Sequence, residues 1–93
     1  MENRLAAEGA RLKAVLIANG VSESEFLIGG FREDAVCIRE EADGYHIFTA
    51  YRGDEDDLVT ATEWMDAVNV FINKLRHDKE LAKKIYDEFV NKI

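Results

Sequence analysis

An Asp-Gly pair, Asp43-Gly44, lies between two runs of alternating apolar and polar residues, AVCIREEA and YHIFTAYR. Alternation with a period of two is typical of a strand that buries one face. Asp-Gly is a strong signal for a two-residue turn, because a type I′ turn needs positive φ at both central positions. Residues 35–52 are therefore predicted to form a β-hairpin, in which Ala42 faces Tyr45 and Val36 faces Tyr51.

The alternation divides this hairpin into two faces of unequal polarity. The more apolar face is predicted to face the core, and it carries Val36, Ile38, Tyr45, Ile47, Thr49 and Tyr51. Phe48 lies on the other face, together with Arg39, His46 and Arg52. Two interpretations of Phe48 stay open: the first helix covers it, or a partner does.

Helical periodicity is found on both sides of the hairpin. Leucines at positions 5, 12 and 16 recur at helical spacing, and Asn19-Gly20 is a typical helix end. After a third short strand at about residues 57–60, Thr60 and Glu63 have the spacing of a capping box, which predicts a helix from Ala61. A last helix follows residues 76–78. Residues 21–30 are left unassigned.

This order of elements predicts the fold class. We expect an α+β fold with an N-terminal helix, a three-stranded antiparallel meander and two C-terminal helices packed on the sheet. A chain of 93 residues is expected to form a single domain, residues 1–93, without a deep cleft for a large cofactor. The sequence shows neither a signal-peptide pattern nor an apolar run long enough to span a membrane, so a cytoplasmic protein is expected.

No catalytic or metal-binding motif is recognised in the chain. GxSxG, P-loop and GxGxxG patterns are absent, and an EF-hand loop starting at Asp54 would have Leu58 and Val59 at positions 5 and 6. His46 and His77 have no metal-ligand spacing, and Cys37 is the only cysteine. We therefore expect no catalytic residues, no metal and no cofactor, and an enzyme is the least favoured class.

The net charge of −7 is concentrated in the middle of the chain, where residues 31–61 hold nine acidic and three basic side chains. An acidic surface argues against direct binding of nucleic acid or of an anionic membrane, because both need a basic face. A meander reverses twice, which brings the start of its first strand beside the turn before its third. The predicted partner-binding surface is therefore Glu33, Asp34, Asp54, Glu55, Asp56 and Asp57, with Phe48 and Tyr51 as apolar anchors.

A second interpretation of the acids also stays open. Charged turns keep a small sheet in solution and protect its edge strands. Clustering of like charges, however, costs stability through repulsion, and a device for solubility alone would mix the signs, as residues 62–93 do with six of each.

Residues 31–90 contain a strand segment GYHIFTAYRG, an acidic turn, a helix segment ATEWMDAVNVFINKLRHD and a closing helix. This organisation resembles the small immunity proteins of bacterial contact-dependent growth inhibition and polymorphic toxin systems. The resemblance implies a protein without enzymatic activity that binds a cognate toxin domain 1:1 in the cytoplasm. Many such toxins are basic nucleases, so an acidic surface would take the place of nucleic acid.

The resemblance assigns no individual binding residue, because those families share no invariant signature that can be placed on this chain. The alternative function is a small regulatory or antitoxin-like protein-binding module, assembled through its last helix and without a nuclease target.

Overall fold

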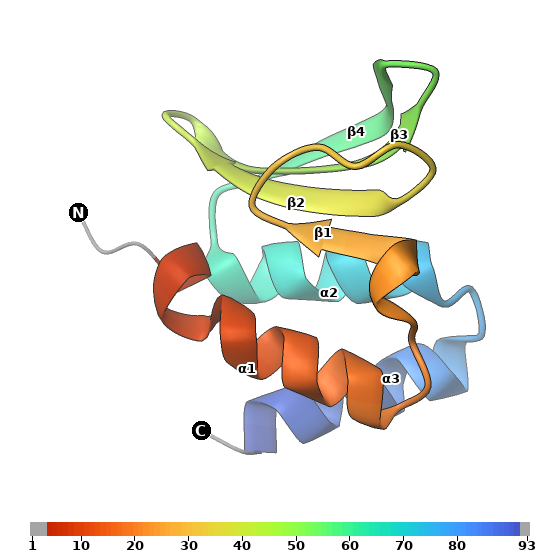
Figure 1. Ribbon diagram of the computed structural model, residues 1–93. Coiled ribbons are helices and arrows are strands. Elements are labelled where there is room, and N and C mark those ends of the chain that lie inside the picture. The colour runs from red at the N-terminus through yellow and green to blue at the C-terminus, as the bar shows by residue number, and fades with distance from the viewer. Residues whose placement is uncertain (1–3, 92–93) are drawn as a thin grey trace.

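The structure, a computed structural model, describes residues 4–91. Its elements in chain order are α1 (Arg4–Ala18), the 3₁₀ turn η1 (Glu23–Glu25), β1 (Phe26–Ile28), β2 (Val36–Glu41), β3 (Gly44–Tyr51), β4 (Asp54–Ala61), α2 (Trp64–Leu75) and α3 (Lys79–Asn91). The strands form one mixed sheet in the order β1-β2-β3-β4. The three helices lie on one side of this sheet, with α2 directly against it (Figure 1). The predicted α+β class is confirmed.

The prediction of three antiparallel strands is wrong, because β1 adds a fourth. β1 pairs in parallel with β2, with Phe26 opposite Val36. Parallel neighbours ordinarily need a connection of a dozen or more residues, usually with a helix in it. Here residues 29–35 make the connection. β1 is only three residues long, and Gly29 and Gly30 take positive φ values of 89° and 145°, which turn the chain sharply.

The β2–β3 hairpin forms, but its turn is Ala42-Asp43 and not Asp43-Gly44. Glu41 pairs with Gly44, and Val36 pairs with Thr49 rather than with the predicted Tyr51. The pairing is shifted by two residues, so every side chain keeps its predicted face. Gly44 has another use: a Cβ there would lie 2.6 Å from the carbonyl oxygen of Ala61, so the glycine allows β4 to approach closely.

The helix after the sheet begins later than predicted. β4 continues to Ala61, and α2 begins at Trp64 with Glu63 as an N-cap whose side chain makes no capping hydrogen bond. The predicted capping box of Thr60 and Glu63 is therefore wrong. A capping box forms instead in the unassigned region at the start of η1, where Ser22 and Glu25 cap each other's backbone.

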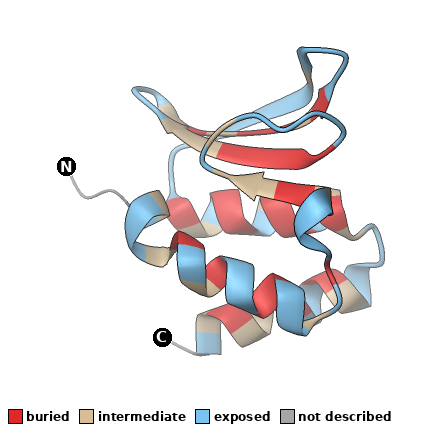
Figure 2. Cartoon of the chain, in the orientation of Figure 1, coloured by how far each residue is buried: buried red, intermediate tan, exposed pale blue. Residues whose placement is uncertain are grey.

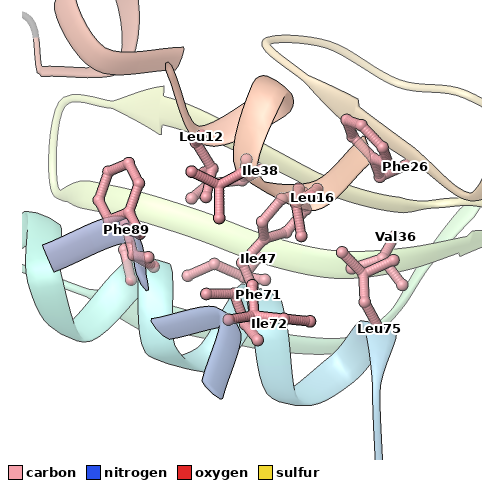
Figure 3. Close-up of a cluster of buried hydrophobic side chains, with 14 of the residues drawn as sticks. Leu12, Leu16, Phe26, Val36, Ile38, Ile47, Phe71, Ile72, Leu75 and Phe89 are labelled. Carbon is pink, nitrogen blue, oxygen red and sulfur yellow. The ribbon is translucent and has the colours of Figure 1, made fainter. Parts of the chain in front are cut away.

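The main core lies between the sheet and the helices. Figure 3 shows Leu12 and Leu16 of α1 among side chains from the sheet, α2 and α3. The largest fully buried members are Leu12, Leu16, Ile38, Ile47, Phe71, Ile72, Ile85 and Phe89. Full burial of one such side chain stabilises the fold by roughly 1.5–3 kcal/mol. The core face predicted for the hairpin is confirmed for Val36, Ile38, Tyr45 and Ile47, which all belong to this cluster. It is wrong for Tyr51, which is exposed at the end of β3.

Of the helices that the structure describes, none is both long enough and apolar enough to cross a membrane.

Candidate functional site

The acidic run Asp54–Asp57 belongs to a strand, whereas the sequence analysis placed it in a turn. The turn between β3 and β4 is Arg52-Gly53, with φ of 52° and 81°, and β4 begins directly at Asp54. This strand lies at the edge of the sheet, with β3 as its neighbour. The carboxylates are therefore distributed along a sheet edge, and successive side chains point to opposite faces.

Glu33 and Asp34 lie beside this hairpin end, as predicted. The Glu33 carboxylate accepts hydrogen bonds from the backbone N–H groups of Arg52 and Gly53, the second at 3.1 Å. The backbone N–H of Asp34 donates to the carbonyl of Ala50 at 2.8 Å. These bonds join the start of β2 to the β3–β4 turn, so all six predicted acids occupy one end of the sheet and the adjoining half of β4.

Two of the six acids are engaged inside the protein. Glu33 holds the turn, and Glu55 forms a two-pronged pair with the Arg39 guanidinium at 2.5 and 3.1 Å. Arg39 also donates to Glu41. The hydrogen bond from Arg39 lowers the pKa of Glu55. The acids left exposed, with no side-chain partner within residues 4–91, are Asp34, Asp54, Asp56 and Asp57.

A β-bulge interrupts the pairing of β4 at Asp57. Ile47 pairs with Val59 and Thr49 with Asp56, so one extra residue lies on β4 between these pairs. Asp57 adopts a φ of 52°, a left-handed conformation that aspartate tolerates better than most residues. The Lys74 ammonium of α2 donates to the carbonyl oxygen of Asp57 at 2.6 Å. The bulge therefore also ties the edge strand to a helix.

The structure buries Phe48, which the sequence analysis offered as an apolar anchor for a partner. Its exposed fraction is 0%, and it packs with Ala35, Cys37 and Ala50 in a small cluster on the outer face of the sheet. The cover is not the first helix: the Phe31 ring stacks on Phe48 with centroids 6.0 Å apart, and the Arg39 guanidinium lies 5.0 Å from its centroid. Phe48 therefore stabilises the fold and is not exposed to a partner, so its prediction as an apolar anchor is wrong.

Other apolar side chains are exposed near the acids. Tyr51 is 47% exposed, with the Arg52 guanidinium over its ring, and Leu58 and Val59 on β4 are 46% and 38% exposed. Figure 2 shows β4 exposed along most of its length, in contrast to β2 and β3. We call the exposed residues Asp34, Tyr51, Asp54, Asp56, Asp57, Leu58 and Val59 the β4 surface.

Sequence reasoning did not identify Leu58 and Val59 as surface residues, because it placed them only in a short strand at about residues 57–60. It also missed Phe31, which is 43% exposed while it covers Phe48. A usable signal was the run FREDA after Gly29-Gly30, in which an aromatic residue precedes the acids.

Cys37 and His46, which carry the most reactive side chains, lie in environments that indicate a role in the fold and not in catalysis. Cys37 is fully buried, and burial raises the pKa of its thiol, which disfavours the thiolate. His46 contacts Asp43 at 2.8 Å, and the hydrogen bond between them lowers the pKa of Asp43. Among residues 4–91, no group of three or more His, Cys, Asp or Glu side chains is arranged to hold a metal ion.

Comparison with protein-family models, with curated proteins and with solved structures finds no match for this chain. Its function is therefore argued from the geometry of the β4 surface.

Proposed function

We propose that this chain is an immunity protein, which binds a cognate toxin domain with a basic surface, such as a nuclease, in the cytoplasm of the bacterial cell that produces both. The observation that carries the proposal is the β4 surface. Four carboxylates without side-chain partners in the described chain lie there beside exposed apolar residues on an open sheet edge.

Charged and apolar side chains would make different contributions to binding. Opposite charges on two proteins accelerate their encounter and disfavour wrong partners. Apolar side chains at the centre of an interface supply much of the affinity that lasts. On the β4 surface the first role falls to Asp34, Asp54, Asp56 and Asp57, and the second to Tyr51, Leu58 and Val59.

The open edge of β4 adds a third source of affinity. An edge strand presents unpaired backbone N–H and C=O groups, to which an extended segment of a partner can add as a further strand. The half of β4 after the bulge carries no charge and suits such pairing, whereas the half before it is acidic. A toxin segment that pairs here would have its basic residues next to Asp54 and Asp56.

The test is titration calorimetry against the C-terminal domain encoded by the neighbouring upstream gene, at low and at high salt. The variant Asp54→Asn/Asp56→Asn/Asp57→Asn removes three charges and spares Glu33 and Glu55, which hold the fold. Asparagine also tolerates the left-handed backbone at position 57. We expect unchanged folding, binding weaker by about tenfold or more at low salt, and a smaller salt dependence.

A charge-matched control is Asp66→Asn/Glu80→Gln/Asp87→Asn, which changes helix residues and leaves β4 intact. It should bind like the unchanged protein. Equal loss in both triple variants would mean that only net charge matters, and equal retention would remove the β4 surface from the interface. Absence of binding by the unchanged protein at any salt would favour the regulatory or antitoxin-like alternative.

A further inference from the structure

Asn19-Gly20, the pair that ends α1, is the only Asn-Gly pair of the chain. Asparagine is a thermolabile residue, and a following glycine makes it more so, because no side chain obstructs the approach of the glycine nitrogen to the asparagine amide. Every other asparagine of the sequence precedes arginine, valine or lysine. Asn19 is therefore the asparagine of this chain most prone to lose its amide.

The reaction consumes only water. A bond forms between the Gly20 nitrogen and Cγ of Asn19, and the bond from Cγ to Nδ2 breaks. Ammonia leaves with the proton of the Gly20 nitrogen, and the two residues are left in a cyclic imide. Water then opens the imide at either carbonyl carbon and restores the Gly20 N–H. The product is aspartate or isoaspartate, so the net change is from amide and water to acid and ammonia.

Both reacting groups are held by hydrogen bonds in the folded chain. Nδ2 of Asn19 donates to the carbonyl of Val15 at 2.8 Å and to Oε2 of Glu88 in α3 at 2.7 Å. Both hydrogens of the amide are thereby used. The backbone N–H of Gly20 donates to the carbonyl of Ile17 at 3.0 Å. Attack on the amide therefore requires that these bonds be broken.

The backbone around the pair is fixed as well. Leu16 and Val21, on either side of it, are 0% and 2% exposed, and the Val21 N–H donates to the Leu16 carbonyl at 3.0 Å. To reach Cγ of Asn19, the Gly20 nitrogen must turn the peptide plane between the two residues out of this helix end. α1 lies against α3 (Figure 1), so the reaction has to wait for a local opening of α1.

The acidic product cannot remake the contact with α3. A carboxylate has no hydrogen to donate, so the Val15 carbonyl and the Glu88 carboxylate both lose their donor, which is costly for half-buried acceptors. The new negative charge also lies beside Glu88, and like charges at this distance repel. Isoaspartate in addition lengthens the main chain by a methylene group at the end of α1.

We propose that Asn19 is a site of spontaneous deamidation, that the contact of α1 with α3 protects it, and that its acidic product weakens this contact. An opening of α1 that lasts long enough for the reaction is then no longer fully reversible. The site uses no residue of the β4 surface, and it does not require that the chain bind a toxin.

The experiment incubates the full chain at mildly alkaline pH, once in buffer and once in concentrated urea. Peptide mass spectrometry follows the conversion of each asparagine, and released ammonia is measured as well. In urea we expect Asn19 to convert faster than Asn69 and Asn73, and Gly20→Ala to slow it. In buffer the conversion of Asn19 should be slower than in urea by about tenfold or more.

Variants of α3 test the source of the protection. Glu88→Ala removes one acceptor of the amide and should accelerate the conversion of Asn19 in buffer by about threefold or more, without effect in urea. Glu80→Ala is the matched control, because it removes a carboxylate at the exposed start of the same helix. It should leave both rates unchanged.

Substitutions that imitate the product test its effect on the fold. Asn19→Asp should lower the equilibrium constant for folding about tenfold, as measured by urea denaturation. Asn19→Ala, which loses the donor without adding a charge, should lower it less. Asn19→Asp/Glu88→Gln exchanges the acid and the amide, so the new amide can donate to the new carboxylate. This double variant should be more stable than the sum of the two single changes predicts.

Two sets of results would overturn the proposal. Equal conversion of Asn19 in buffer and in urea would remove the protection by the fold, and absence of conversion in urea would remove the site. Unchanged stability of Asn19→Asp, or strict additivity in the double variant, would mean that the contact with α3 tolerates the product. None of these measurements uses a partner, so their failure is distinct from a failure of the binding experiment with the toxin domain.

Discussion

At the scale of single residues, the same side-chain type serves structure or surface according to its neighbours. Glu33 and Glu55 are committed to the turn and to Arg39, whereas Asp54 and Asp56, next to them, have no side-chain partner in the described chain. Phe48 is covered by a second phenylalanine, Phe31, which is itself partly exposed. A candidate site based on residue type alone therefore mixes residues that hold the fold with residues free to bind.

Gly44 gives a prediction at this scale. Its φ is 131°, and an added Cβ would lie 2.6 Å from the Ala61 carbonyl oxygen, which is backbone and cannot move away alone. Gly44→Ala should lower the free energy of unfolding by roughly 2–4 kcal/mol, because backbone strain and overpacking add. Urea denaturation measures it. Gly53→Ala is the matched control: its φ is 81°, but nothing lies within 4 Å, so about 1 kcal/mol is expected. Equal losses would contradict the close approach of β4.

At the scale of elements, the sequence was sufficient wherever the signal was local. The end of α1 at Asn19-Gly20, both faces of the hairpin and the two C-terminal helices follow from spacing within a few residues. β1 was not predictable in this way, because three residues cannot show alternation and its parallel partner β2 lies beyond a glycine-rich connection. The cover of Phe48 by Phe31 is non-local for the same reason.

The extent of β4 was missed because of composition. Aspartate and glutamate are depleted in strands, so a run of four acids indicates a turn. Pairing with β3, and the hold of the tight Arg52-Gly53 turn, outweigh this preference. The residues that form the turn, Arg52 and Gly53, directly precede the acids. In a turn the four carboxylates would be clustered at one place, whereas in an edge strand they are distributed along the edge of the sheet.

The bulge at Asp57 supplies the prediction for this element. Its left-handed φ of 52° is unfavourable for β-branched residues, whereas glycine takes it freely. Asp57→Val should therefore lower the free energy of unfolding by about 1–2 kcal/mol, and Asp57→Gly should leave it unchanged or raise it slightly, as measured by thermal and urea unfolding. Equal effects of the two would mean that the side chain, not the backbone, matters at this position.

At the scale of the whole molecule, charge is organised by the two ends of the sheet, while the helices bring charges of both signs. The β4 surface continues from the β3–β4 turn, and a second group of carboxylates, Glu40, Glu41 and Asp43, lies by the β2–β3 turn. Ion pairs connect parts far apart in the chain: Arg76, just after α2, donates to both oxygens of Glu25 in η1, at 3.0 and 3.3 Å. Such links fix the connection before β1 against the helices.

These ion pairs predict how stability depends on pH. Hydrogen bonds from Arg76 lower the pKa of Glu25, and hydrogen bonds from Arg39 lower that of Glu55, both from an ordinary value of 4.5. A carboxyl whose pKa is lower in the folded state contributes its full stabilisation above pH 4.5 and loses it as the pH falls through the folded pKa. The urea concentration at which half of the protein is unfolded should therefore decrease as the pH is lowered below 4.5.

The double variant Glu25→Gln/Glu55→Gln separates these pairs from the general effect of acid. It should be less stable than the unchanged protein at neutral pH, because both ion pairs are gone. The two should converge as the pH falls through the lowered pKa values of Glu25 and Glu55 and these carboxyls become protonated in the unchanged protein as well. Glu80→Gln, at a carboxylate with no side-chain partner among residues 4–91, should follow the unchanged protein throughout. If the curves of the double variant and the unchanged protein stayed parallel from neutral pH to acid, the ion pairs of Arg76 with Glu25 and of Arg39 with Glu55 would make no measurable contribution to the pH dependence of stability.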